Sequence, residues 1–141
     1  MTDTVAFVRG VRGWLGVVVL CALVAAACGS DPESDPSDEQ PFPDVIAATA
    51  TRDGEAWNFS ATISSPYDTP QRYADAWRII APDGSVLGTR ELAHDHAGEQ
   101  PFTRSLTGIE VPSGVGAVAI EGRDRVNGWG GGTVQLDLSE P

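Results

Sequence analysis

The hydrophobic and polar positions of this chain follow three successive patterns. Residues 14–28 are almost entirely apolar, and residues 29–44 are almost entirely polar. From residue 45 onward, apolar and polar residues alternate, and turn-forming residues interrupt the alternation about every ten positions. Because successive side chains of a strand point to opposite faces of a sheet, a period of two predicts half-buried strands. The sequence therefore predicts an apolar leader, a polar linker and one domain built from strands.

The most regular alternation lies in residues 55–65. Polar residues there would face solvent, and the apolar residues between them would face the core. These core-facing residues are Trp57, Phe59, Ala61 and Ile63. The Asp53-Gly54 pair favours a tight turn, which predicts a hairpin with a strand over residues 45–52. Further strands are expected at residues 72–81, 85–93, 102–111, 115–123 and 133–138, with loops at 66–71, 94–101 and 127–132.

Seven short antiparallel strands in about 100 residues resemble an immunoglobulin or fibronectin type III domain. Trp77 on the third predicted strand adds to the resemblance, since these domains often place a core tryptophan there. The resemblance implies an all-β fold, namely a seven-stranded antiparallel immunoglobulin-like β-sandwich over residues 45–141. Residues 73–77 and 128–131 also resemble parts of a domain of uncharacterised exported bacterial proteins, and that resemblance implies no activity.

The leader has the pattern of a signal peptide. Arg9 and Arg12 precede its apolar segment, which is short for a membrane-spanning helix of about 20 apolar residues. Three alanines, Ala25 to Ala27, end the segment directly before Cys28. Residues 1–27 are therefore expected to be removed on export.

The residues around Cys28 resemble the lipobox of bacterial lipoproteins. The resemblance implies that Cys28 carries the lipid, including palmitate, and holds the domain to the cell membrane or outer membrane, facing outside the cytoplasm. Lipoproteins usually have leucine three residues before the cysteine, where this chain has Ala25. Ala25 and Ala27 also suit ordinary signal peptidase, which would release a soluble protein with a free Cys28. An uncleaved anchor is the third alternative.

The polar linker has a composition that disfavours folding. Residues 29–44 contain six acidic residues, four prolines and no basic residue. Such a segment buries too little apolar surface to offset its ordering entropy, so we expect it to be disordered. The predicted organisation is a signal peptide (1–27), a lipidated cysteine with a disordered acidic tether (28–44) and a β-sandwich (45–141).

The charge and the cysteine content limit the partners and the kinds of membrane attachment that the protein can have. The chain has nine arginines, no lysine and twenty acidic residues, for a net charge of −11. Nucleic acid is excluded as a partner, because proteins bind it largely by neutralising phosphates. Anionic lipid would repel the protein, so any attachment to a membrane must be covalent or hydrophobic. Cys21 lies in the leader, and the domain therefore has no thiol and no disulfide.

Three charged residues are predicted to lie on apolar strand faces. Asp75 shares a face with Trp77, while Arg90 and Arg104 lie on two other strands. Because a buried charge needs a partner, we expect Asp75 to pair with Arg90 or Arg104 and all three to form an ion cluster. The cluster would set the strand register or form the floor of a ligand site.

His94 and His96 are the two histidines of the chain. In an extended segment, residues two apart point the same way, so both imidazoles could bind one copper or zinc ion. Two histidines are fewer than the three or four protein ligands usual for zinc. The alternative is that both are ordinary loop residues.

Trp129 lies in a glycine run, Gly128 to Gly132, predicted to be an end loop. Its indole could contact a ligand such as a sugar or partner, or fold back over the core. No nucleophile elbow, phosphate loop or zinc-protease motif occurs, so no enzyme activity is expected. The sequence favours a non-catalytic, membrane-anchored lipoprotein whose domain binds another envelope component, a protein or glycan. The alternative is an envelope metal-binding protein that uses His94 and His96.

Overall fold

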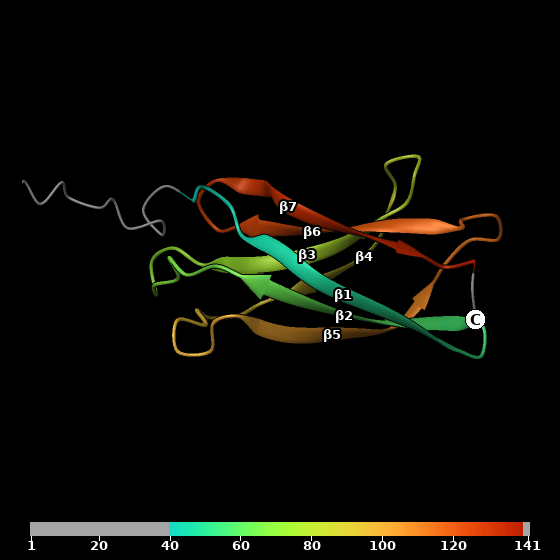
Figure 1. Ribbon diagram of the computed structural model, residues 1–141, viewed down its shortest axis with the longest axis horizontal. Coiled ribbons are helices and arrows are strands. Elements are labelled where there is room, and N and C mark those ends of the chain that lie inside the picture. The colour runs from blue at the N-terminus through green and yellow to red at the C-terminus, as the bar shows by residue number, and fades with distance from the viewer. Residues whose placement is uncertain (1–39, 140–141) are drawn as a thin grey trace, which may run out of the picture. The chain divides into compact units, whose positions relative to one another are not determined.

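The computed structural model describes residues 40–139 of the chain (Figure 1). The predicted signal peptide, Cys28 and most of the acidic linker lie outside the described residues. The elements of secondary structure within residues 40–139 are all β-strands. This range contains no helix long and apolar enough to cross a membrane.

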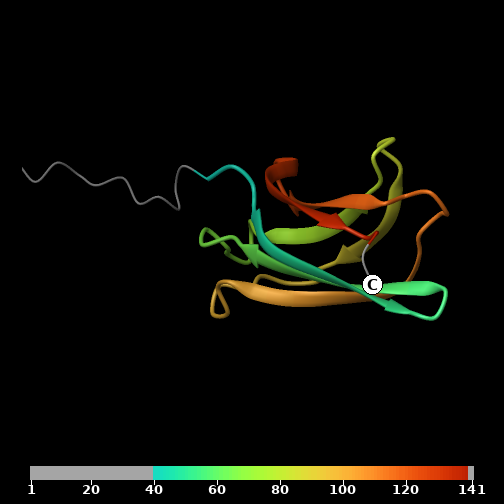
Figure 2. The same ribbon diagram turned by 45° about the vertical axis from the view of Figure 1, so that its right-hand side comes forward.

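Seven strands form two antiparallel sheets that pack face to face (Figures 1 and 2). The first sheet has the order β1-β2-β5, and the second has the order β4-β3-β6-β7. The strands are β1 (Asp44–Asp53), β2 (Ala56–Ser64), β3 (Ala74–Ile80), β4 (Val86–Glu91), β5 (Phe102–Glu110), β6 (Ala117–Asp124) and β7 (Gly128–Asp137). The predicted all-β architecture of seven antiparallel strands is confirmed.

The core lies between the two sheets and follows the predicted alternation. Phe59 and Ile63 of β2 pack there with Trp77 of β3 and Ile120 of β6, and each is at most 1% exposed. Full burial of one such side chain contributes about 1.5–3 kcal/mol. The core therefore joins the two sheets without any disulfide in the described part of the chain.

The predicted β1–β2 hairpin is present, with Gly54 in the left-handed region at its turn (φ 64°). Near its start, β1 contains a bulge between Val45 and Ala47. The bulge leaves Ile46 unpaired with β2 and 53% exposed.

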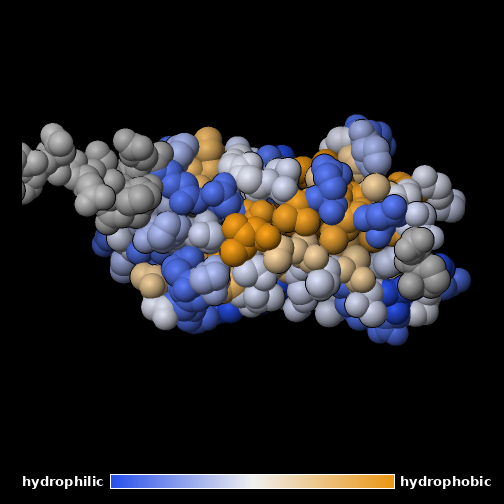
Figure 3. Space-filling view, in the orientation of Figure 1, coloured by the Kyte–Doolittle hydropathy of each residue, from blue (hydrophilic) through white to orange (hydrophobic). Residues whose placement is uncertain are grey.

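An apolar band crosses the middle of the molecular face formed by β1 and β7 (Figure 3).

The glycine run is not the predicted end loop but the first half of β7. Its glycines leave room for residues 42–44. A side-chain carbon on Gly130 would lie 2.8 Å from the Phe42 ring, and one on Gly131 would lie 2.1 Å from the Pro43 carbonyl oxygen. Gly131 also has a φ of 89°, which disfavours any other residue. The glycines are therefore required by the close approach of a distant segment.

Residues 40–44 also differ from the prediction, because they pack on the domain rather than belonging to a disordered tether. Pro43 is buried. Arg72 Nη2 donates to the Gln40 carbonyl oxygen at 2.7 Å, and Asn127 Nδ2 donates to that of Pro41 at 2.8 Å. The Gly132 amide donates to Asp44 Oδ1 at 2.6 Å. The folded domain thus includes residues from Gln40 onward.

Candidate functional site

An aromatic and charged cluster lies on the outer face of the four-stranded sheet. Trp129 of β7 is half-buried and lies in register with Arg123 of β6. The guanidinium carbon of Arg78 lies 4.1 Å from the centre of the indole ring, and that of Arg123 lies 5.1 Å from it. These distances are typical of cation–π contacts. Trp129 therefore neither covers the end of the core nor lies in a loop.

Ion pairs extend this cluster across the sheet. Arg123 Nε lies 2.7 Å from Asp75 Oδ1, and Arg123 Nη2 lies 2.9 Å from Glu91 Oε2. Arg78 Nη2 lies 2.6 Å from Glu121 Oε2. The hydrogen bond with Asp75 raises the pKa of Arg123 above its ordinary value. We call this group the Trp129 cluster; its members are Asp75, Arg78, Glu91, Glu121, Arg123 and Trp129.

The predicted ion cluster of Asp75, Arg90 and Arg104 does not form. A bulge between Ala74 and Ala76 interrupts the pairing of β3 with β6. The extra residue is Asp75, which lies beside Arg123 instead of sharing the inner face with Trp77. The bulge therefore reverses the face that simple alternation predicts for Asp75.

The two predicted arginine partners lie on edge strands. Arg104 of β5 follows the predicted face, since its guanidinium carbon lies 5.3 Å from the Phe102 ring, but its ion-pair partner is Glu99 at 2.8 Å. Arg90 of β4 lies in register with Trp77, yet its side chain is exposed because β4 ends the sheet. Within residues 40–139, Arg90 forms no ion pair.

The His96 ring stacks on the His94 ring and on the Phe102 ring. The His96 ring lies 4.0 Å from the Phe102 ring and 4.8 Å from the His94 ring, measured between centroids. His96 is 3% exposed, and its Nδ1 has no hydrogen-bond partner in the described part of the chain. Burial lowers the pKa of His96 below its ordinary value. His96 thus packs on Phe102, which belongs to the core.

This stack does not fit the predicted copper or zinc site. Two imidazoles that bind one ion must direct lone pairs, which lie in the ring planes, toward a common point. The planes of His94 and His96 differ by only 26° and lie one above the other. Residues 40–139 contain no group of three or more His, Cys, Asp or Glu side chains placed to hold a metal.

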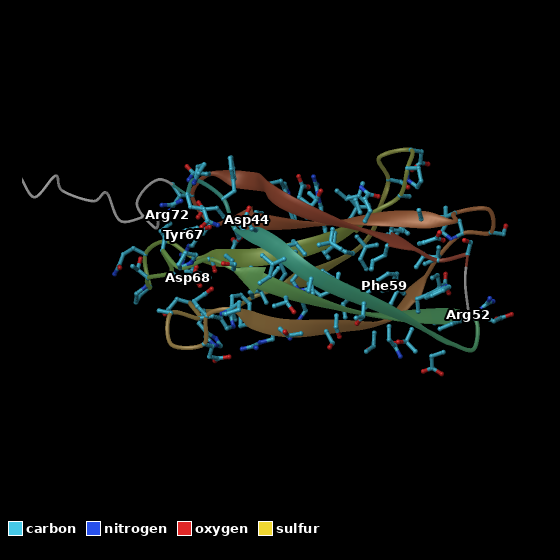
Figure 4. All side chains as sticks on the ribbon, in the orientation of Figure 1. Asp44, Arg52, Phe59, Tyr67, Asp68 and Arg72 are labelled. Atoms are coloured by element: carbon cyan, nitrogen blue, oxygen red, sulfur yellow. The ribbon has the colours of Figure 1, made fainter. Side chains whose placement is uncertain are left out.

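Two buried aspartates, Asp68 and Asp124, organise the loops at the end of the domain where residue 40 lies; Figure 4 labels Asp68 and Arg72 at this end. Asp68 accepts hydrogen bonds from the backbone amides of Ala74 and His96, and burial raises its pKa. Asp124 is fully buried and pairs with Arg72 at 3.1 Å. Sequence alternation missed both because they lie in or beside loops. The available signal was an aspartate before a turn, where it can bind backbone amides.

A shallow hollow adjoins the Trp129 cluster on the same sheet face. Ile80 and Ala119 are paired across β3 and β6, two residues along each strand from Arg78 and Glu121. Val86 pairs with Ile80 and is 48% exposed. The residues that line the hollow are Ile80, Ala81, Pro82, Gly84, Ala117, Val118, Ala119 and Gln135.

Comparison with known proteins shows what the chain is similar to. The chain matches no protein-family model. It is 43% identical over 84 residues to a protein of Halomicrobium mukohataei named "Putative lipoprotein". The match covers 60% of this chain and 41% of the relative, so this chain spans about two fifths of that protein's length. A hypothetical protein of Pyrococcus horikoshii OT3, known from its crystal structure, is 14% identical, with a TM-score of 0.45 over 69% of this chain and 87% of the other.

Proposed function

We propose that this chain is an exported lipoprotein, anchored through Cys28, whose domain binds another component of the cell envelope without catalysis. The observation that carries the proposal is the 43% identity over 84 residues with a protein named "Putative lipoprotein". The leader supports it independently, because a charged start, a short apolar segment and three alanines precede Cys28. Lipid on that cysteine would keep this acidic protein at a membrane.

The domain is proposed to be immunoglobulin-like. Support comes from the strand order, with β1-β2-β5 in one sheet and β4-β3-β6-β7 in the other. Immunoglobulin-like domains likewise divide antiparallel strands between two sheets and place a buried tryptophan on the third strand, as Trp77 is here.

The proposed binding surface is the outer face of the four-stranded sheet. Tryptophan and arginine are the residues most enriched at energetically important contacts. Trp129 with Arg78 and Arg123 provides both types on one face, next to the hollow and the exposed Val86. On the outer face of the other sheet, the paired hydroxyls Ser60–Ser105 and Thr62–Thr103 hydrogen-bond mainly to each other.

Lipid attachment is tested by replacing each cysteine in turn. We expect cells that express the chain to incorporate radiolabelled palmitate into it, and Cys28→Ala to abolish the label and release the protein from the membrane fraction. Cys21→Ala is the matched control and should keep both label and membrane location. Label that persists in Cys28→Ala, or a chain that never takes up palmitate, would refute lipidation at this site.

Envelope binding is tested by photo-crosslinking in intact cells. A photoreactive amino acid in place of Val86 should give a discrete adduct, because Val86 borders the proposed surface. The same substitution at Thr103, exposed on the opposite sheet, should give none. The Val86 adduct should disappear in Trp129→Ala. Equal adducts from both positions, or an adduct that is indifferent to Trp129, would contradict the assignment of the face.

A further inference from the structure

The Trp129 cluster and the hollow form one elongated surface. Along β6, Arg123 lies beside Trp129, Glu121 beside Arg78, and Ala119 beside Ile80 and Gln135. From Arg123 to Ala119 is four residues of strand, or about 13 Å at about 3.3 Å per residue. The surface thus begins at an aromatic ring, crosses polar pairs and ends in a depression whose lining combines three alanines and a glycine with Ile80, Pro82, Val118 and Gln135.

The charges of this surface are already paired. Arg78 is held by Glu121, and Arg123 is held by Asp75 and Glu91. The three carboxylates outnumber the two guanidinium groups by one, so this group of residues offers no unpaired positive charge to a polyanion. Paired groups still present donors and acceptors to solvent, because Asp75, Arg78, Glu121 and Arg123 are each about one fifth to one quarter exposed. The surface therefore suits an uncharged polar ligand.

The surface formed by the Trp129 cluster and the hollow exposes few large apolar side chains for a protein interface. Protein interfaces usually bury a central apolar group of side chains surrounded by a polar rim. Ile46, Val86 and Val126 are the large apolar side chains exposed in the described residues; Val86 pairs with Ile80 beside the hollow, and Val126 lies in the turn between Arg123 and Trp129. A single partly exposed indole among hydrogen-bonding groups instead matches a ligand with an apolar C–H face and hydroxyl edges.

We propose that the Trp129 cluster and the adjoining hollow bind an uncharged glycan chain of the envelope. The exposed part of the indole packs on the C–H face of a sugar ring. The guanidinium groups donate to hydroxyls, and the carboxylates beside them accept from hydroxyls. The hollow receives the next rings along the chain. This inference rests on the proposed envelope-binding function and names the partner class for the same face.

The test is isothermal titration of the exported full chain with three neutral tetrasaccharides: cellotetraose, mannotetraose and the tetramer of N-acetylglucosamine. We expect at least one to bind with a Kd below about 1 mM. Trp129→Ala should weaken that binding at least about tenfold, and Trp129→Phe, which keeps a ring, should weaken it less. Arg78→Met should also weaken it. Ser105→Ala on the opposite sheet is the control and should bind as the unmodified chain does.

Two results would overturn the glycan proposal: no binding of any tetrasaccharide at millimolar concentration, or unchanged binding by the folded Trp129→Phe and Arg78→Met variants. If either occurs while the Val86 crosslink remains dependent on Trp129, the face binds a protein and the proposed function survives. If that crosslink also fails, the proposed function fails with it.

Discussion

At the residue scale, the most informative side chain is His96. It is 3% exposed, stacked between Phe102 and His94, and its Nδ1 has no partner in the described residues. Burial lowers its pKa, and the positive charge of Arg104 lowers it further, against the opposing effects of Glu99 and Asp68. The folded protein therefore resists protonation of His96 more than the unfolded chain does.

This difference predicts how stability changes with pH. Below about pH 6.5, the unfolded chain binds a proton at His96 that the folded protein does not, so the free energy of unfolding should fall as pH falls from 7 toward 5. The loss is about 1.4 kcal/mol for each unit by which the pKa is lowered. His96→Phe should remove this part of the slope. Urea unfolding at several pH values measures it.

The exposed His94 supplies the control for that experiment. His94→Ala should keep most of the slope between pH 7 and 5, because His96 remains buried against Phe102. If His96→Phe and the unmodified protein lose stability in parallel over this range, the burial of His96 is not the cause.

At the scale of elements, β7 shows how a strand can depend on a segment far away in the chain. Its glycines provide the space into which Phe42 and Pro43 pack, and its backbone binds Asp44. By period and composition the same run predicts a loop, because glycine has a low preference for strands. Trp129 is thereby carried on a strand that crosses the sheet face rather than on a loop.

Substitution of Gly131 should therefore destabilise the domain. A left-handed conformation costs other residues about 1–2 kcal/mol, and the added carbon would also meet the Pro43 carbonyl. We expect Gly131→Ala to lower the free energy of unfolding by at least that amount in urea titrations. Gly116→Ala, where the added carbon meets nothing within 4 Å, should change it by less than about 0.5 kcal/mol. Equal effects of the two substitutions would disprove the packing argument.

At the scale of the whole molecule, the described domain begins at the end that carries the buried Asp68 and Asp124. Residues 40–44 connect to the loops there through Arg72, which Figure 4 labels, and through Asn127. The outer face with Trp129 extends away from this end along β3 and β6.

The position of the domain boundary can be tested by truncation. A chain that begins at Val45 should melt at least about 5 °C below one that begins at Gln40, because it loses the buried Pro43 and the hydrogen bond from Arg72. Calorimetry of the two purified domains compares them directly. Identical melting temperatures would show that residues 40–44 contribute nothing to folding.

The local pattern of apolar and polar residues was sufficient to predict much of the fold. The alternation of Phe59, Ala61 and Ile63 correctly indicated the buried face of β2, and Asp53-Gly54 correctly indicated the first hairpin. The seven strands followed from the same period. These features are encoded within a few neighbouring residues, because strand pleating and turn geometry act over that range.

Tertiary structure decided the rest. Asp75 pairs with Arg123, 48 positions away, because a bulge that depends on the pairing of β3 with β6 turns it outward. The Gly132 amide donates a hydrogen bond to Asp44, 88 positions away. Through such contacts, a segment whose sequence resembles a loop forms a strand. Neither outcome has a local signal, since a bulge and a close approach exist only once two distant segments pack together. The sequence by itself determined an all-β domain with its first hairpin and most of its buried faces, whereas packing determined which charged and aromatic residues share the outer face.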